Sequence, residues 1–279
     1  MRLYTIDTGF FKLDGGAMFG VVPKTIWNKI NPADEKNLCT WAMRCLLIET
    51  GSALVLIDCG LGNKQSEKFF SYYEPHGNTT LLDSLSRHGF SPNDVTDVVL
   101  THLHFDHCGG AINKEGERYV PAFPNAVYWT DEAHWQWALH PNDREKASFL
   151  RENILPIEAS GQLRFLKQGS DVYPGFDYIR VFGHTEAMII PLIRFKEITL
   201  AYMADLIPSA GHIPVPYVMG YDVRPLITMQ EKKDFLKKAY ENNYVLFFEH
   251  DPQIECCSLQ LSEKGVRLKQ TFTLQEIIG

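Results

Sequence analysis

The sequence predicts an α+β fold in which two packed β-sheets carry helices on their outer faces. Segments rich in β-branched and aromatic residues alternate with helical patterns in the first half of the 279-residue chain, and the second half repeats that order. Two sheets that bury their apolar faces against each other, with helices outside, satisfy this order. No Ser/Gly-rich linker or low-complexity tract divides the chain, so we expect one domain over residues 1–279.

The expected strands of the first half are short apolar segments separated by glycine or polar residues. Gly51 indicates a hairpin between the first two of them. We expect strands at residues 39–49, 52–57, 97–100 and 126–129. We expect helices at about residues 63–73 and 79–88, through residues 134–137 after a cap at Thr130 or Asp131, and at about residues 143–152.

The second half predicts strands on both sides of one long loop and one helix. The loop covers residues 208–225 and is rich in Pro, Gly and aromatic residues, and loops of this length are often functional. The helix is expected at about residues 228–241, where Lys232, Lys233, Lys237 and Lys238 resemble one solvated face. We expect strands at residues 163–166, 178–182, 188–195, 199–203, 244–248, 255–261 and 266–269.

Composition excludes several classes of protein. The formal net charge is −7 and no cluster of Lys and Arg is present, so we expect no nucleic-acid partner. The N-terminus lacks the apolar run of a signal peptide and no segment is long enough to span a membrane, which predicts a cytoplasmic protein with no membrane partner. The six cysteines lack the spacing of a disulfide framework, so we expect buried free thiols.

The segment Thr101-His-Leu-His-Phe-Asp-His-Cys-Gly-Gly is the main chemical signal. It places three of the chain's 10 histidines and one aspartate within six residues, and such crowding points to metal coordination. His102 and His104 are two residues apart, so in extended backbone they point the same way and can share one ion. Asp106 and His107 are adjacent and point differently. Four such side chains fit two neighbouring ions better than one.

Three further candidate ligands follow apolar strands later in the chain. His184 follows the strand expected at residues 178–182, Asp205 ends an apolar run, and His250 follows another. In α/β folds, chemistry gathers at such strand ends. A single His at a strand end would be unremarkable, but three candidate ligands at strand ends together with the cluster predict one joint metal site.

These residues resemble the motifs of the metallo-β-lactamase-fold hydrolases, over nearly the whole chain. Order and spacing agree for all five motifs of that family, and the resemblance implies an αββα sandwich with the metals at one edge. It implies a first metal held by His102, His104 and His184, a second held by Asp106, His107 and His250, and Asp205 as the bridge between them. Asp58, the first motif, is implied to orient the cluster loop through hydrogen bonds without being a ligand.

The sequence differs from three branches of that superfamily. Its binuclear-iron oxidoreductases carry Glu at the position of His104, its lactamases usually lack a ligand at the position of His107, and its RNA-processing members carry a basic exosite. Residues 13–20, the stretch from residue 204 through His212, and Tyr221-Asp222 resemble the branch that holds acyl-homoserine lactone lactonases and methyl-parathion-type hydrolases. Members of this branch are often dimers, so a homodimer is one expected state.

The position of the family's catalytic tyrosine departs from that branch. Some lactonases place a catalytic Tyr three residues after the bridging Asp, but this chain has Pro208 there. Tyr221 or His212 would have to substitute, or the function differs. We expect Phe19 and Tyr221, which lie in Gly-rich loops, to line the substrate pocket, and His212 either to line it or to lie outside it.

The chemistry implied is hydrolysis by a hydroxide that bridges two divalent cations. Asp106 is the candidate to hold this nucleophile and then to pass its proton to the leaving group. Nitrogen-rich ligands suit zinc, with manganese, iron or cobalt as alternatives. The other histidines, His76, His88, His134 and His140, are expected to be exposed or capping, and Cys108 to pack as a small buried residue.

The resulting hypothesis is a dinuclear hydrolase of a small ester-like substrate. A lactone of the acyl-homoserine type is the first expectation. A phosphotriester and a thioester of the glyoxalase II type are the alternatives. Two other classes remain open: a non-catalytic metal-binding or sensing module, and a mononuclear-iron oxygenase. Seven intact ligand positions count against the first of these.

Overall fold

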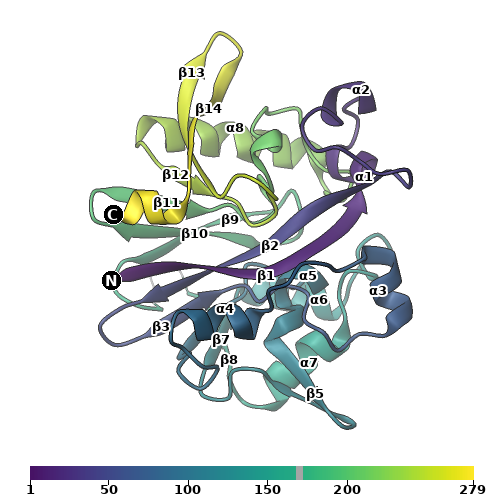
Figure 1. The fold of residues 1–279 in the computed structure, drawn as a ribbon, viewed down its shortest axis with the longest axis vertical. Coiled ribbons are helices and arrows are strands. Elements are labelled where there is room, and N and C mark those ends of the chain that lie inside the picture. Colours follow the sequence, from purple (N-terminus) through teal and green to yellow (C-terminus); the bar gives the residue numbers. More distant parts are fainter. Residues whose placement is uncertain (168–171) are drawn as a thin grey trace. The chain divides into compact units, whose positions relative to one another are not determined.

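The computed structural model describes residues 1–167 and 172–279, and it confirms the α+β class with two mixed six-stranded sheets (Figure 1). The chain forms two compact units. Unit 1 comprises Met1–Gly9, Met43–Tyr72 and His76–Pro174, and unit 2 comprises Phe10–Ala42, Tyr73–Pro75 and Gly175–Gly279. The single domain over residues 1–279 stays a prediction. No helix of the described residues is long and apolar enough to cross a bilayer.

The first sheet belongs mainly to unit 1 and sets the direction of its strand ends. β2 and β3 form the expected hairpin, with Leu46 opposite Ile57, whereas β3, β4, β7 and β8 pair in parallel. The carboxyl ends of the parallel strands therefore meet at one edge. In spatial order the strands are β1 (Arg2–Asp14), β2 (Leu38–Glu49), β3 (Leu54–Ile57), β4 (Asp97–Val99), β7 (Val127–Thr130) and β8 (Leu163–Phe165).

Helices and a hairpin complete unit 1 around a core that includes Val98, Tyr128 and Trp135. Trp135 is fully buried. Asp131 caps its helix by accepting from Ala133 N at 2.8 Å, which confirms one of the two predicted caps. The remaining elements are α3 (Glu67–Tyr73), α4 (Leu81–Arg87), α5 (Phe105–Cys108), η1 (Gly109–Ala111), β5 (Ile112–Glu115), β6 (Arg118–Pro121), α6 (Glu132–Leu139) and α7 (Arg151–Ala159).

The helix predicted at residues 143–152 is wrong. Residues 143–148 form turns, and α7 begins only at Arg151. Asn142 caps a first turn, because its Oδ1 accepts from the backbone N–H groups of Arg144, at 2.8 Å, and Glu145, at 3.2 Å. That turn does not continue as a helix, since the carbonyl of Ser148 accepts from Phe105 N at 3.0 Å instead of from the next helical turn. Sequence patterns also missed β1, the β5–β6 hairpin and the short helices α1, α2 and α9.

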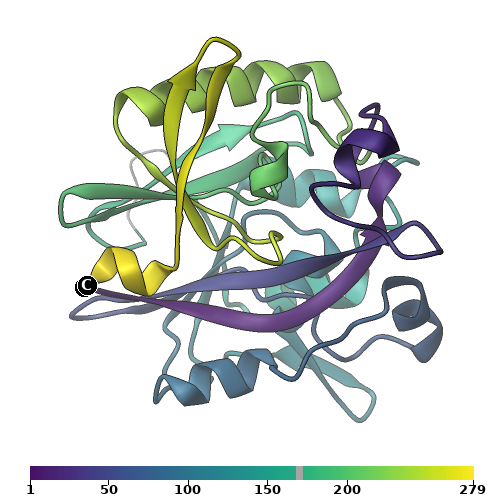
Figure 2. The same cartoon turned by 45° about the horizontal axis from the view of Figure 1, so that its top comes forward.

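The second sheet lies in unit 2, and α8 (Pro225–Glu241) contacts its strands β13 and β14 (Figures 1 and 2). The spatial order is β14 (Gly265–Phe272), β13 (Cys256–Ser262), β12 (Val245–Phe247), β11 (Ile198–Tyr202), β10 (Met188–Phe195) and β9 (Phe176–Val181). Unit 2 also holds α1 (Gly15–Phe19), α2 (Lys24–Trp27), η2 (Ala210–His212) and α9 (Leu274–Ile278).

Three strands of the second sheet run in the same direction and end at the same edge. β11 and β12 are parallel, with Tyr202 opposite Phe247. β9 and β11 both pair antiparallel with β10, so they share one direction. His184, Asp205 and His250 each follow one of these three strands within three residues. The sheet topology therefore brings the three predicted ligands of unit 2 to one edge.

Lys232 corrects the expectation of one solvated lysine face on α8. Lys233, Lys237 and Lys238 are exposed, but Lys232 is fully buried. Its ammonium donates to the backbone carbonyls of Pro214, Val215 and Tyr217, the closest at 2.6 Å. A buried cation needs such acceptors, because burial without them strongly favours the neutral form. Lys232 therefore ties α8 to the loop over residues 208–225.

Candidate metal centre

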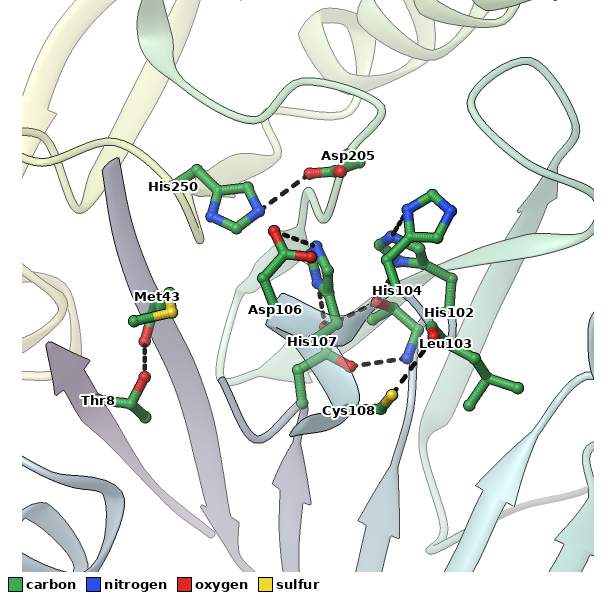
Figure 3. A network of polar contacts seen from close by, with 12 residues as sticks. Thr8, Met43, His102, Leu103, His104, Asp106, His107, Cys108, Asp205 and His250 are labelled. Carbon is green, nitrogen blue, oxygen red and sulfur yellow. Dashed lines mark hydrogen bonds and ion pairs between the residues drawn. The ribbon is translucent and has the colours of Figure 1, made fainter. Parts of the chain in front are cut away.

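The histidine cluster of unit 1 begins where β4 ends. His102 lies between β4 and the short helix α5, and His104, on extended backbone, is the N-cap of that helix. His102 Nε2 and His104 Nδ1 lie 3.1 Å apart, and both rings are buried (Figure 3). Two imidazole nitrogens converge to this distance when they face a common proton or cation. The structure thus brings together the pair that was predicted to share one ion.

Asp106 and His107 lie on α5 itself, one residue apart. Asp106 Oδ2 is 3.7 Å from His107 Nε2, and His107 is fully buried. The two residues point differently, as adjacent residues of a helix must. Gly109 and Gly110 follow directly, and a Cβ on Gly110 would lie 2.1 Å from the backbone oxygen of Cys59. These glycines let the loop pass close to the end of β3, so the cluster is held on a tight backbone.

Asp58 follows β3 and organises this cluster through hydrogen bonds. Its carboxylate accepts from Thr101 N at 2.8 Å and from Thr101 Oγ1 at 2.6 Å. Its Oδ2 also lies 3.2 Å from His107 Nδ1. Asp58 adopts φ 57°, a left-handed conformation that Asp and Asn tolerate better than most residues. The side chain is fully buried and contacts the loop, while its effect on metal retention stays a prediction.

Asp205 links two histidines within unit 2. Its Oδ2 lies 3.0 Å from His184 Nε2, and its Oδ1 lies 3.2 Å from His250 Nε2 (Figure 3 draws the second contact). Each carboxylate oxygen is thus directed to a different imidazole. A carboxylate that serves two ions must divide its oxygens in this way. The three side chains are buried, with exposed fractions between 2 and 6%.

The electrostatic field at His184 favours positive charge. Burial lowers the pKa of His184, but the carboxylates of Asp205 and Asp222 outweigh burial and raise the pKa to about 10. Asp222 Oδ1 lies 2.9 Å from His184 Nδ1, and Asp222 Oδ2 accepts from Met219 N at 3.2 Å. Two carboxylates around one buried ring provide the negative potential that a cation site needs.

All five predicted histidine ligands share one arrangement, in which one ring nitrogen faces an oxygen. A contact of this kind favours one tautomer, which leaves the other nitrogen free of a proton and able to bind a metal. The contacts are His102 Nδ1 with Thr101 Oγ1 at 3.2 Å, His104 Nε2 with Glu145 Oε1 at 3.6 Å, His107 Nδ1 with Asp58 Oδ2 at 3.2 Å, His184 Nδ1 with Asp222 Oδ1 at 2.9 Å, and His250 Nδ1 with the carbonyl of Ala42 at 2.7 Å. Five oriented imidazoles and two buried carboxylates fit divalent metal ions.

The predicted substrate residues of unit 2 lie in different environments. Tyr221 is 39% exposed. Phe19 is fully buried and stacks on His212, with ring centroids 4.4 Å apart, and on Trp27. His212 is also fully buried, between Ser209 Oγ at 2.7 Å and the carbonyl of Met18 at 2.9 Å. Phe19 and His212 therefore pack inside unit 2, and contact of the three residues with a substrate stays a prediction.

His134 corrects the expectation that it is exposed or capping, whereas His76, His88 and His140 are exposed as predicted. His134 is fully buried, and its Nε2 accepts from Leu103 N at 2.8 Å. That bond holds the backbone between His102 and His104. The sequence contained a sign of this burial, because His134 precedes Trp135, and both lie on the buried side of α6 with Ala138. The polar residues around His134 in the sequence favoured the wrong expectation.

Replacing Asp58 is expected to weaken metal retention without removing a ligand. In Asp58→Ala, Thr101 N and His107 Nδ1 lose their acceptor, and outer-partner mutations of this kind cost about 10–100-fold in metal affinity. Competition with a coloured chelator measures the effect. Asp58→Asn is the matched variant, because it tolerates the same left-handed backbone and keeps one acceptor oxygen. Equal metal affinity of Asp58→Ala and the native chain would exclude this role.

His212 is expected to make the fold acid-sensitive. Burial lowers its pKa from 6.5 to about 3, so the unfolded chain binds more protons than the folded chain between these values. The free energy of unfolding therefore falls as pH falls below about 6.5, by about 2 kcal/mol between pH 7 and 5. Urea unfolding of the native chain and His212→Phe at both pH values measures the difference in slope. The exposed-site variant His88→Gln is the control, and equal slopes for His212→Phe and the native chain would refute the expectation.

Known proteins resemble this chain along most of its length. Residues 44–250 match the family model of the metallo-beta-lactamase superfamily. The N-acyl homoserine lactonase AiiA of Bacillus thuringiensis subsp. kurstaki is 24% identical over 267 residues, which cover 91% of this chain and 94% of the relative. The N-acyl homoserine lactonase AttM of Rhizobium radiobacter is 22% identical over 178 residues, which cover 61% of this chain and 64% of the relative.

Solved structures agree in fold. A probable metal-dependent hydrolase from Staphylococcus aureus superposes with a TM-score of 0.89 at 27% identity, covering 98% of this chain and 96% of the other. The dizinc quorum-quenching lactonase AidC, solved with a product bound, superposes with a TM-score of 0.81 at 23% identity. The superposition covers 97% of this chain and 95% of AidC. Together with the matched family model, this similarity shows that the chain belongs to the metallo-beta-lactamase superfamily and is a metal-dependent hydrolase.

Proposed function

We propose that this chain is a dinuclear hydrolase that opens a lactone of the acyl-homoserine type. The observation that carries the proposal is the Asp205 carboxylate, whose two oxygens are directed to His184 and His250 separately. A site for a single ion has no need of such a divided carboxylate. The pairing of His102 with His104, and of Asp106 with His107, supports two ions from the side of unit 1.

The ligands divide into two sets that share Asp205. We assign His102 Nε2, His104 Nδ1 and His184 Nε2 to the first ion, because these are the nitrogens that do not face their orienting oxygens. By the same criterion His107 Nε2 and His250 Nε2 join Asp106 at the second ion. A set dominated by imidazole suits zinc, with manganese, iron or cobalt as alternatives.

Two bound divalent ions would lower the pKa of a shared water towards neutrality and polarise the reacting carbonyl. The chain's own residues supply orientation and proton transfer. We assign to Asp106 the task of holding the proton released by the attacking water and delivering it to the ring oxygen when the lactone C–O bond breaks. Asp106 suits this task because it is carried by α5, next to His107, and is 8% exposed.

The lactone is favoured over the other ester-like substrates by the relatives. Two of them, aligned over 91% and 61% of this chain, are known as N-acyl homoserine lactonases. Pro208 stands where some lactonases have a catalytic Tyr, and Tyr221 in the same loop, which is 39% exposed, is the candidate to replace that phenol. We propose a cytoplasmic location, because all six cysteines are buried free thiols.

The test combines metal analysis with a substrate panel. Elemental analysis of the purified protein is expected to find two divalent ions per chain. An acyl-homoserine lactone, an aryl phosphotriester and an S-acyl glutathione thioester are then compared by kcat/KM, with the lactone expected to be highest. A higher value for the phosphotriester or thioester would replace the lactone with that substrate. Two bound ions per chain without hydrolysis of any ester would favour a sensing module. One bound iron per chain together with oxygen consumption would favour an oxygenase.

A further inference from the structure

The structure assigns to Glu145 a positioning role: its carboxylate fixes the tautomer of His104 so that Nδ1 binds the metal. The inference rests on the proposed dinuclear site. His104 is the exception among the five histidines, because its Nε2 faces an orienting group whereas the other four use Nδ1 for that contact. The facing group, Glu145 Oε1, lies 3.6 Å from Nε2, an electrostatic contact longer than a hydrogen bond, and the Glu145 side chain is 3% exposed.

The geometry of Glu145 leaves only one of its oxygens for His104. Oε2 accepts from Trp137 Nε1 at 2.8 Å and from Asn142 Nδ2 at 2.6 Å. Trp137 can only donate, since the indole N–H has no acceptor capacity. The Asn142 amide cannot turn over, because its Oδ1 accepts from the backbone N–H groups of Arg144 and Glu145. Oε2 is therefore committed to two donors, and Oε1 is directed to His104.

The segment that carries Glu145 is tied to the segment that carries His104. Phe105 N donates to the carbonyl of Ser148 at 3.0 Å, and Ser148 N donates to the carbonyl of Glu145 at 2.7 Å. The ring of Phe149 packs against the His104 ring, with centroids 4.8 Å apart. The turn over residues 142–149 is thus anchored beside the cluster. A carboxylate held in this way selects the Nε2–H tautomer of His104 and makes Nδ1 more basic.

Glu145→Gln is the decisive variant, because it keeps the shape of the side chain. The two donors at Oε2 hold the amide oxygen there, so the amide NH2 faces His104 Nε2. That nitrogen must then accept, and the proton moves to Nδ1, the metal-binding atom. We expect metal affinity to fall by about 10–100-fold. Glu145→Asp, which keeps the charge, is expected to recover part of the affinity. Glu158→Gln, an exposed Glu on α7, is the matched control and is expected to bind like the native chain.

Two measurements test the inference separately from the proposed function. The ¹⁵N chemical shifts of the His104 ring in metal-free protein are expected to show Nε2–H in the native chain and Nδ1–H in Glu145→Gln. Chelator competition gives the zinc affinity of each variant. An Nε2–H tautomer that persists in a folded Glu145→Gln protein, or an unchanged zinc affinity, would overturn the role of Glu145. If the native chain binds no metal while the tautomer still switches, the dinuclear proposal fails and the orienting contact stands.

If Glu145→Gln does not fold, the same inference is tested from the other side of the carboxylate. Trp137→Phe removes one donor from Oε2 and leaves Glu145 charged. We expect the His104 tautomer to stay Nε2–H and zinc affinity to fall by less than tenfold. A tautomer that switches in Trp137→Phe, where the carboxylate is retained, would contradict the assignment to Glu145.

Discussion

His104→Ala is expected to lower metal content and to abolish hydrolysis together. The variant removes the nitrogen that lies 3.1 Å from His102 Nε2, so the proposed first ion would lose one of its three nitrogen donors. Outer partners of ligands already contribute about 10–100-fold, and loss of a ligand itself is expected to exceed that, at about 1,000-fold or more in kcat/KM. Elemental analysis and lactone hydrolysis on the same preparation measure both quantities.

The control for His104→Ala must separate metal loss from misfolding. His140→Ala removes an exposed imidazole from the end of α6, close in the sequence to Glu145, and is expected to keep both ions and full activity. Circular dichroism of metal-free His104→Ala and native protein should coincide. Full hydrolytic activity of a metal-free His104→Ala protein would refute the proposed mechanism.

Asp205→Asn is expected to release both ions, whereas His104→Ala weakens the first ion more than the second. The amide keeps the size of the side chain but loses the negative charge and one of the two acceptor oxygens. In the metal-free protein the new NH2 group can donate to His184 Nε2 or His250 Nε2, so the fold is expected to persist. Zinc titration followed by calorimetry should show the loss of both binding steps.

The matched control for Asp205→Asn is Asp234→Asn on the exposed side of α8, where the same change of charge is far from any predicted ligand in sequence. It is expected to bind two ions like the native chain. If Asp205→Asn retained one tightly bound ion and lost only the other, Asp205 would be a ligand of one metal and the bridging assignment would be wrong.

The elements that sequence patterns predicted well are those with strong periodicity and clear ends. The hairpin at Gly51 and the helix after Asp131 are confirmed, because glycine turns and Asp caps have local physical causes. β1 was missed because its sequence, RLYTIDTGFFKLD, mixes polar and apolar residues on both sides of Gly9. The break in the helix predicted after Asn142 was missed because it depends on Phe105 N, far away in sequence, which donates to the carbonyl of Ser148.

The sequence indicated which residues gather at the candidate site, but not the groups that contact them. The predicted ligands are rare residue types at strand ends, and their assignment as ligands stays a prediction. The orienting groups are ordinary residues far away in sequence, such as Glu145 for His104 and Asp222 for His184, or a main-chain carbonyl, as at Ala42. Any Glu, Asp or peptide group can serve, and only the folded chain shows which one does. Lys232 was misread for the same reason, since its acceptors are carbonyls of a loop.

The use of Nδ1 by His104 has a consequence for the reach of each ligand. Nδ1 is bonded to Cγ, whereas Nε2 lies on the far side of the ring, so His104 would hold its ion closer to the main chain than the other four histidines. A small shift of the backbone at His104 therefore displaces the ion almost as far as the backbone itself moves, with little side-chain rotation available to absorb it. Two hydrogen bonds hold the backbone on either side of His104. Phe105 N donates to the carbonyl of Ser148, and Leu103 N donates to His134 Nε2. Substitutions in the turn over residues 142–149 should accordingly lower the affinity for the proposed first ion as strongly as substitutions in β4, which precedes His102 and His104.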